Sequence, residues 1–281
     1  MDTNSSPQDA ALRTDRGRVA ILTINRPERL NAYNDDVACG LMAHFSDIAA
    51  DPGIGACVLT GAGSKAFCAG ADLKNEATHR VASMDEHLSG VAGIGQDVVG
   101  ATGTEFFEAL LSFPKPLICA VNGYAIGIGF QLQLCCDLIV ASTTARFKLP
   151  QVSLGIMPAY GGAPRLAQWV GRGKAAEIAL TGRFVDAEEA ERIGLVASLH
   201  APDVVLDRAV EIAEAIAANL PQSLALIKES LANGLEDGQL HAASVGDIYR
   251  FMALSQTSAA LGEHESWRRR KDDPDAADGE E

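Results

Sequence analysis

Two glycine-containing turns are the parts of this sequence best suited to chemistry. The first reads FCAGADLK at residues 67–74, and the second reads NGYAIGIGF at residues 122–130. Each comes where a buried apolar run meets the expected start of a helix, so backbone N–H groups there have no helical acceptor and point outward. Two such turns brought together would aim two donors at one point, which is the geometry of an oxyanion hole. The simpler alternative is that the glycines only let the chain turn sharply.

The elements that position these turns follow from apolar periodicity. Four apolar, β-branched runs predict strands at residues 18–24, 56–61, 117–121 and 138–142. Asn34 and Asp35 are expected to cap a helix that Asp51-Pro52-Gly53 ends. Further helices are expected at about residues 105–111, 173–181, 186–193, 203–219, 222–233 and 237–261. Strands and helices alternate first and helices dominate last, which predicts a layered α/β core followed by a helical region.

Charge and hydropathy exclude two classes of partner. The 281 residues include 37 Asp and Glu against 23 Lys and Arg, a formal net charge of −14 that argues against a nucleic-acid surface. Residues 116–136 carry no charge and are long enough to cross a membrane, but proline, glycine and amide residues divide them into core elements. We therefore expect no nucleic-acid and no membrane partner.

The N-terminal residues and the cysteines indicate the compartment. The first residues have neither the cationic nor the apolar region of a secretory signal. The six cysteines form no CxxC pair, which favours buried, reduced thiols over a disulfide or a metal site. We expect a cytoplasmic protein without a metal.

Longer motifs around the two turns resemble the crotonase (enoyl-CoA hydratase/isomerase) superfamily. The matching segments lie between about residues 16 and 271 and are, in order, NRPERLNAYN, VLTGAGSKAFCAGADLK, KPLICAVNGYAIGIGFQLQLCCDLIVAS, ARFKLPQVSLGIMPAYGGAPRL, ALTGRFVDAEEAERIGLV and WRRRK. The resemblance implies an α/β fold, a crotonase-type spiral of ββα units with a C-terminal helical trimerisation region. It also implies binding of an acyl-CoA thioester by a homo-oligomer, a trimer or a dimer of trimers, with no cofactor beyond the CoA of the substrate.

The expected domain organisation follows this resemblance. A flexible N-terminus at 1–15 precedes the spiral core at 16–202 and the C-terminal helical region at 203–271. Residues 272–281 hold six carboxylates, and we expect them to form an acidic, disordered tail.

By position, the resemblance assigns the two oxyanion donors to the N–H groups of Ala71 and Ile128. The family commonly has glycine at the second position, and the branched Ile128 restricts the backbone and adds bulk beside the thioester. The implied substrate-binding residues are Ala71, Asp72, Leu73, Lys74, Arg26 and Arg29, the basic ones serving the CoA phosphates. In the family, the residue at the position of Asp72 more often secures its loop than reacts. The RRRK run at residues 268–271 either approaches the CoA bound to a neighbouring subunit or compensates the dipole at the C-terminus of its helix.

Hydratases of this family use two glutamates, and here the two corresponding positions are Gln131 and Gln151. Glutamine has nearly the shape of glutamate and can hydrogen-bond a water molecule, but it has no accessible protonation equilibrium. General acid–base catalysis is typically worth about 10²–10⁴-fold, so the loss of both carboxylates predicts that hydration is inefficient.

Another residue could supply the base. Some relatives carry an acid or a tyrosine near the stretch that corresponds to residues 157–161, where Tyr160 is the only titratable side chain. A phenol is a poor base near neutral pH, and the alternative is that the ring simply packs in its loop. Residues 75–108, whose first part shows no clear periodicity, hold His79, Asp85, Glu86, His87, Asp97, Glu105 and Glu108, any of which is more often a solvated surface group.

The sequence leaves three functions open. The first is an enzyme of the enoyl-CoA hydratase/isomerase type that stabilises a thioester enolate. The second is a non-catalytic protein that binds or delivers acyl-CoA. The third, an RNA-binding relative, is disfavoured by the acidic surface.

Overall fold

The computed structural model describes residues 7–72, 101–154, 158 and 160–236. The chain divides into two compact units, Met1–Ala217 and Ala218–Glu281. The first unit holds two sheets and their helices, and the described part of the second unit is the helix α10 (Pro221–Glu236).

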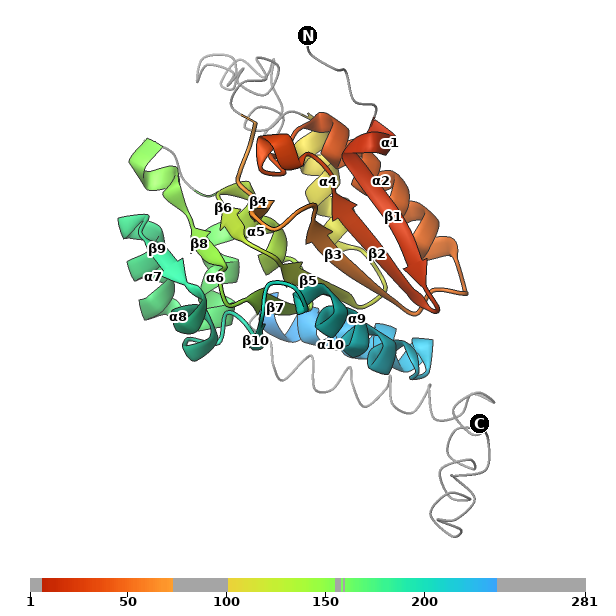
Figure 1. The fold of residues 1–281 in the computed structure, drawn as a ribbon. Coiled ribbons are helices and arrows are strands. Elements are labelled where there is room, and N and C mark those ends of the chain that lie inside the picture. The colour runs from red at the N-terminus through yellow and green to blue at the C-terminus, as the bar shows by residue number, and fades with distance from the viewer. Residues whose placement is uncertain (1–6, 73–100, 155–157, 159, 237–281) are drawn as a thin grey trace, which may run out of the picture. The chain divides into compact units, whose positions relative to one another are not determined.

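The larger sheet has six strands in the order β1-β2-β3-β5-β7-β10 (Figure 1). The first two strands pair antiparallel, and all the other neighbours are parallel. The strands are β1 (Ala11–Arg16), β2 (Val19–Ile24), β3 (Ala56–Gly61), β5 (Leu117–Val121), β7 (Leu138–Ser142) and β10 (Ser198–His200).

The chain passes three times from a strand of the larger sheet to a strand of a second, smaller sheet. Strands β3, β5 and β7 are each followed along the chain by a short strand of the smaller sheet, whose order is β4-β6-β8-β9. Its members are β4 (Ala66–Cys68), β6 (Tyr124–Ile126), β8 (Arg146–Lys148) and β9 (Phe184–Asp186). This alternation between two sheets is the repeated ββα unit that the resemblance implied, and the predicted fold class is confirmed.

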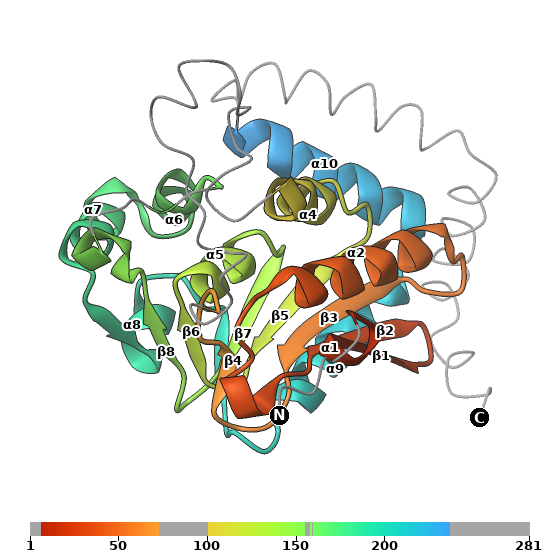
Figure 2. The same ribbon diagram turned by 90° about the horizontal axis from the view of Figure 1, so that it is seen from above.

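Helices cover both faces of the larger sheet (Figure 2). Because side chains alternate along a strand, Val19 and Ile21 face the apolar side of α9 (Val205–Ala217), while Leu22 and Ile24 face the main core. A parallel sheet that is covered on both faces explains why its strands are continuous apolar runs. The other helices of the first unit are α1 (Pro7–Ala10), α2 (Asp35–Ala50), α4 (Ala101–Leu111), α5 (Ile128–Leu134), α6 (Gly162–Val170), α7 (Arg172–Thr181) and α8 (Ala187–Arg192), with the 3₁₀ turns η1 (Pro27–Arg29) and η3 (Pro150–Leu154).

Local signals set several boundaries as predicted. The Asn34 side chain accepts a hydrogen bond from the Val37 N–H at 3.1 Å and caps α2.

Residues 11–15, which we expected to be flexible, instead form most of β1 and pair with β2. The other domain ranges remain a prediction, and the expected helix at 237–261 and the acidic tail lie outside the described residues.

No single helix of the described part of the chain is long and apolar enough to cross a bilayer, and α9 together with residues 221–232 meets the requirement only as a bent pair, by length and composition.

Candidate active site

The two glycine turns touch each other in the folded chain. Gly70 (φ 112°) and Gly127 (φ 58°) both have the positive φ that glycine adopts readily. A Cβ atom on Gly127 would lie 3.8 Å from the Cα of Gly70, so the turns are in van der Waals contact. The approach is closest at Gly129, where a Cβ atom would lie 2.0 Å from the carbonyl oxygen of Cys68. Helix α5 can begin at Ile128 only because position 129 has no side chain.

Backbone pairing determines which donors remain for a ligand. The Tyr33 N–H donates to the Gly70 carbonyl and the Asp72 N–H donates to the Tyr33 carbonyl, both at 2.8 Å. Along an extended segment successive N–H groups point to opposite sides, so the Ala71 N–H between these bonds points away from Tyr33. Ile128 is the first residue of α5 and lacks a helical acceptor. Neither N–H donates to a backbone carbonyl of the described residues, so both remain available to a ligand.

A pair of buried glutamines lies at the second turn. The Gln151 Nε2 donates to the Gln131 Oε1 at 3.0 Å, and the two residues are only 8% and 4% exposed. A Cβ atom on Gly127 would lie 3.9 Å from the Gln151 Nε2, which places this amide against the turn. The Gln151 Oε1 is buried and has no hydrogen-bond partner among the described residues. The site therefore presents two neutral amides and one orphaned acceptor.

The neighbouring helix approaches the pair closely as well. A Cβ atom on Gly162, at the start of α6, would lie 2.9 Å from the Gln131 Nε2. The helices α5 and α6 thus enclose the Gln131 amide, which explains its burial. The sequence could not predict this contact, because 31 positions separate Gln131 from Gly162 along the chain.

The predicted substrate-binding residues divide into two groups. Arg26 is directed to the first turn: its Nη2 donates to the Asp72 Oδ2 and its Nη1 to the Ala32 carbonyl, both at 2.7 Å. Asp72 therefore secures the turn, as its position suggested. Arg29 is exposed, whereas Leu73 and Lys74 lie outside the described residues.

Replacing Arg26 with methionine should destabilise the fold. The Arg26 and Asp72 side chains are 13% and 10% exposed, and removal of one partner leaves the other charge largely desolvated. Such a loss costs about 3–5 kcal/mol in a buried pair, so we expect about 3 kcal/mol here. Urea unfolding followed by circular dichroism measures the change, with Arg29→Met as the exposed control. Equal stability of the two variants would contradict a structural role for the pair.

An aromatic row that the sequence did not predict runs from the first turn to Tyr160. Tyr33 contacts Phe106 at 5.5 Å between ring centroids, Phe106 contacts Phe107 at 5.5 Å, and Phe107 stacks on Tyr160 at 4.3 Å with an interplanar angle of 4°. Tyr160 itself has a φ of 51°, unusual for a residue with a side chain. The Tyr160 ring is thus held against Phe107.

The titratable groups behind the first turn remain neutral at physiological pH. Burial raises the pKa of the Cys68 thiol to about 11, so this cysteine is not a thiolate nucleophile. Burial likewise raises the pKa of Tyr33, whose hydroxyl has no hydrogen-bond partner in the part of the chain that the structure describes. In the described part of the chain, no group of three or more His, Cys, Asp or Glu side chains could hold a metal ion.

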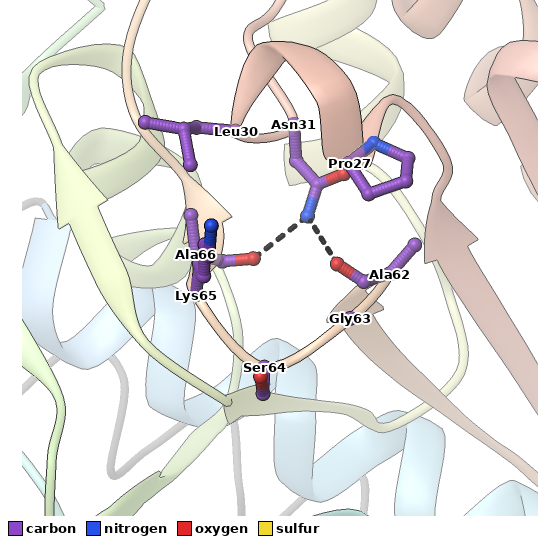
Figure 3. Close-up of a pocket in the computed structure, with 8 residues that line it drawn as sticks. All are labelled: Pro27, Leu30, Asn31, Ala62, Gly63, Ser64, Lys65 and Ala66. Carbon is purple, nitrogen blue, oxygen red and sulfur yellow. Dashed lines mark hydrogen bonds between the residues drawn. The ribbon is translucent and has the colours of Figure 1, made fainter.

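A pocket of about 290 Å³ lies beside the first turn (Figure 3). It is formed by Pro27, Leu30 and Asn31 together with residues 62–66. The Asn31 Nδ2 donates to the carbonyls of Ala62 at 2.9 Å and Ala66 at 2.7 Å, which joins the two walls. Lys65 gives this pocket a cationic rim.

Gln133 is a buried polar residue that the sequence did not single out. It lies in α5 between two leucines and is 0% exposed, and neither amide atom has a hydrogen-bond partner within residues 7–72, 101–154, 158 and 160–236. An unsatisfied buried amide costs about 1–3 kcal/mol, so Gln133→Leu should raise the free energy of unfolding by at least about 1 kcal/mol. Thermal and urea unfolding test this, with Gln168→Leu on the exposed face of α6 as the control. A destabilised Gln133→Leu variant would mean that the amide has a partner in solution.

Proteins similar to this chain carry the names of one enzyme family. A family model described as enoyl-CoA hydratase/isomerase matches residues 14–264. A probable enoyl-CoA hydratase of Rhizobium meliloti is 41% identical over 222 residues, covering 79% of this chain and 80% of that protein. A short-chain-enoyl-CoA hydratase of Clostridium acetobutylicum is 39% identical over 220 residues, covering 78% and 80%. The crystal structure of an enoyl-CoA hydratase from Bacillus anthracis matches with a TM-score of 0.82 at 30% identity, covering 93% of this chain and 96% of that one.

Proposed function

Because this chain belongs to the enoyl-CoA hydratase/isomerase family, we propose that it is an enzyme that binds an acyl-CoA thioester and stabilises the thioester enolate. The thioester oxygen accepts hydrogen bonds from the N–H groups of Ala71 and Ile128. A base removes a proton from the carbon next to the carbonyl, the C–H electron pair forms the C=C bond of the enolate, and the C=O π pair moves onto the oxygen that these donors hold. The contact between the two glycine turns, which carry the donors, supports this assignment.

The hydrogen bond between Gln151 and Gln131 supports a second part of the proposal, namely that the protein is not an efficient hydratase. Hydratases of the family have glutamates at the corresponding positions, and these acids handle the water and the returning proton. A glutamine pair can hold a water molecule but cannot take its proton. Without acid–base help of about 10²–10⁴-fold, hydration should be slow.

The base for enolate formation then comes from elsewhere in the site. Tyr160 and the ionisable side chains of residues 75–108 are the proposed sources.

The second candidate function is non-catalytic acyl-CoA binding or delivery. It is favoured by the same observation, because two amides that bond to each other leave no titrating group at the family's acid positions.

Basic residues and the C-terminal helical region are proposed to serve substrate binding and assembly. Arg29 and Lys74 are proposed to meet the CoA phosphates, while Arg26 acts on the turn through Asp72. Leu73 is a further residue proposed to bind the substrate. We propose a cytoplasmic homo-oligomer, a trimer or a dimer of trimers, whose C-terminal helical region makes the trimer contact and which needs no cofactor beyond the CoA of its substrate.

Titration of the natural protein with 2-enoyl-CoA thioesters tests this function. Saturable binding by calorimetry, with little loss of the conjugated-thioester absorbance, is the expected result. Deuterium exchange of the protons next to the thioester carbonyl, followed by NMR, separates an enolate-forming enzyme from a pure binder. Rapid hydration would overturn the interpretation of the glutamines, and the absence of binding would overturn the proposed function itself.

A further inference from the structure

The aromatic row from Tyr33 through Phe106 and Phe107 to Tyr160 forms a continuous apolar wall. Tyr33 and Phe106 are 0% exposed, and Phe107 is 2% exposed. Neighbouring ring centroids lie 5.5, 5.5 and 4.3 Å apart, which is direct contact between rings. A chain of carbon atoms that reaches this wall cannot pass between its members.

Each end of the row is attached to one of the two turns that carry the donors. Tyr33 pairs with Ala71 in a parallel bridge, so the first ring belongs to the segment beside the first donor. At the other end, Tyr160 lies two residues before Gly162, where a Cβ atom would lie 2.9 Å from the Gln131 Nε2. Gln131 is in the first turn of α5, the helix that begins at the second donor. The row therefore spans the site from one donor to the other.

The structure of a thioester determines which of its parts meets the row. Its oxygen lies between the two donors, its sulfur leads to CoA, and its carbonyl carbon leads to the acyl chain. CoA carries anionic phosphates whose burial would cost free energy, so the sulfur points to solvent. The acyl chain then points to the opposite, buried side of the turns, where the aromatic row lies.

We infer that the aromatic row closes the acyl site and makes the protein selective for short-chain acyl-CoA thioesters, with Phe107 and Tyr160 as the specificity-determining residues. These two rings make the closest contact of the row, with an interplanar angle of 4°. Phe107 comes from α4 and Tyr160 from the residues just before α6, so their stack joins two walls of the site. This inference rests on the proposed function, since the two turns must hold the thioester for its chain to reach the rings.

The backbone of Tyr160 provides a mild way to remove its ring. Its φ of 51° is a conformation that glycine adopts readily and that residues with a side chain adopt at a cost in free energy. The stack on Phe107 contributes against that cost. Tyr160→Gly therefore deletes the ring and suits the backbone.

Calorimetric titration of the full chain with butyryl-CoA, hexanoyl-CoA and octanoyl-CoA tests the inference. These saturated thioesters have no double bond to hydrate, so binding is measured without turnover. In an open apolar site each additional CH₂ group strengthens binding about fourfold, which amounts to more than about 100-fold from butyryl-CoA to octanoyl-CoA. We expect no such gain in the natural protein, where octanoyl-CoA should bind no more tightly than butyryl-CoA.

Two matched pairs of variants assign this limit to the two rings. Tyr160→Gly should bind octanoyl-CoA at least about tenfold more tightly than the natural protein does, whereas Tyr160→Phe keeps the ring and should keep the limit. Phe107→Leu should also bind octanoyl-CoA more tightly. Phe184→Leu changes an exposed ring of β9 and should bind like the natural protein. Circular dichroism shows that each variant is folded before it is titrated.

The outcomes separate the inference from the function on which it rests. A steady gain in affinity from butyryl-CoA to octanoyl-CoA in the natural protein overturns the inference alone. A limit that persists in both Tyr160→Gly and Phe107→Leu also overturns it. Failure of every thioester to bind the natural protein overturns the proposed function and the inference together.

Discussion

Hydration of 2-enoyl-CoA by the Gln131→Glu, Gln151→Glu double variant is expected to be about 10²–10⁴ times faster than hydration by the natural protein. The two amides already lie next to each other, with 3.0 Å between the Gln151 Nε2 and the Gln131 Oε1. The substitutions change little volume, so the turns and the donors of Ala71 and Ile128 should remain in place.

The short separation also predicts how the double variant titrates. Two carboxylates so close cannot both ionise freely, so the pair shares a proton and its two apparent pKa values move apart. One carboxyl group then acts as the acid and the other as the base. The hydration rate should follow a bell-shaped dependence on pH, in contrast to the flat, low rate of the natural protein.

The loss of the conjugated-thioester absorbance measures this rate. Each single variant should gain far less than the double variant, because one carboxylate cannot serve as both acid and base. Gln168→Glu, on the exposed face of α6, adds a negative charge outside the site and should leave the rate unchanged. An inactive double variant that still binds the thioester would show that the acids were not the missing part.

Substitution of Ile128 by proline in the double variant should lower its hydration rate by about 10²–10³-fold, the effect of removing one oxyanion donor. Ile128 occupies the first position of α5, where proline is tolerated because the N–H has no helical acceptor. The substitution therefore deletes a single donor and leaves the helix intact. Ile128→Val retains the donor and should keep most of the rate.

Infrared difference spectroscopy gives a second readout that does not depend on turnover. Two hydrogen bonds weaken the thioester C=O bond and lower its stretching frequency on binding. That shift should be smaller in Ile128→Pro than in the natural protein and unchanged in Ile128→Val. Identical shifts in all three proteins would remove Ile128 from the oxyanion hole.

The sequence predicted four of the six strands of the larger sheet and none of the smaller sheet. Continuous apolar runs such as residues 117–121 form the buried parallel strands, and these predictions are confirmed. Strands β4, β6, β8 and β9 have three residues each, too few for any periodicity to show. β1 was missed because it lies at the sheet edge and most of its side chains are polar and exposed, so its sequence lacks an apolar alternation.

At the site, the sequence identified residue types and the structure supplied their partners. Gln131 and Gln151 were singled out by resemblance, but their mutual hydrogen bond across 20 positions could not be derived from spacing. The hydrogen bond from Arg26 to Asp72 could not be predicted either, because the sequence does not distinguish a surface arginine from an arginine that secures a turn. Long-range pairing of this kind depends on the path of the chain between the two sheets.

The backbone bridge at the first turn makes one amide a natural reporter of occupancy. The N–H groups of Tyr33 and Asp72 are engaged in the bridge, so their hydrogens should exchange slowly with solvent in the free protein and the complex alike. The Ala71 N–H between them has no such protection until a thioester oxygen accepts its bond. Residue-resolved hydrogen–deuterium exchange would therefore show ligand binding as the slowing of a single amide between two that are already slow.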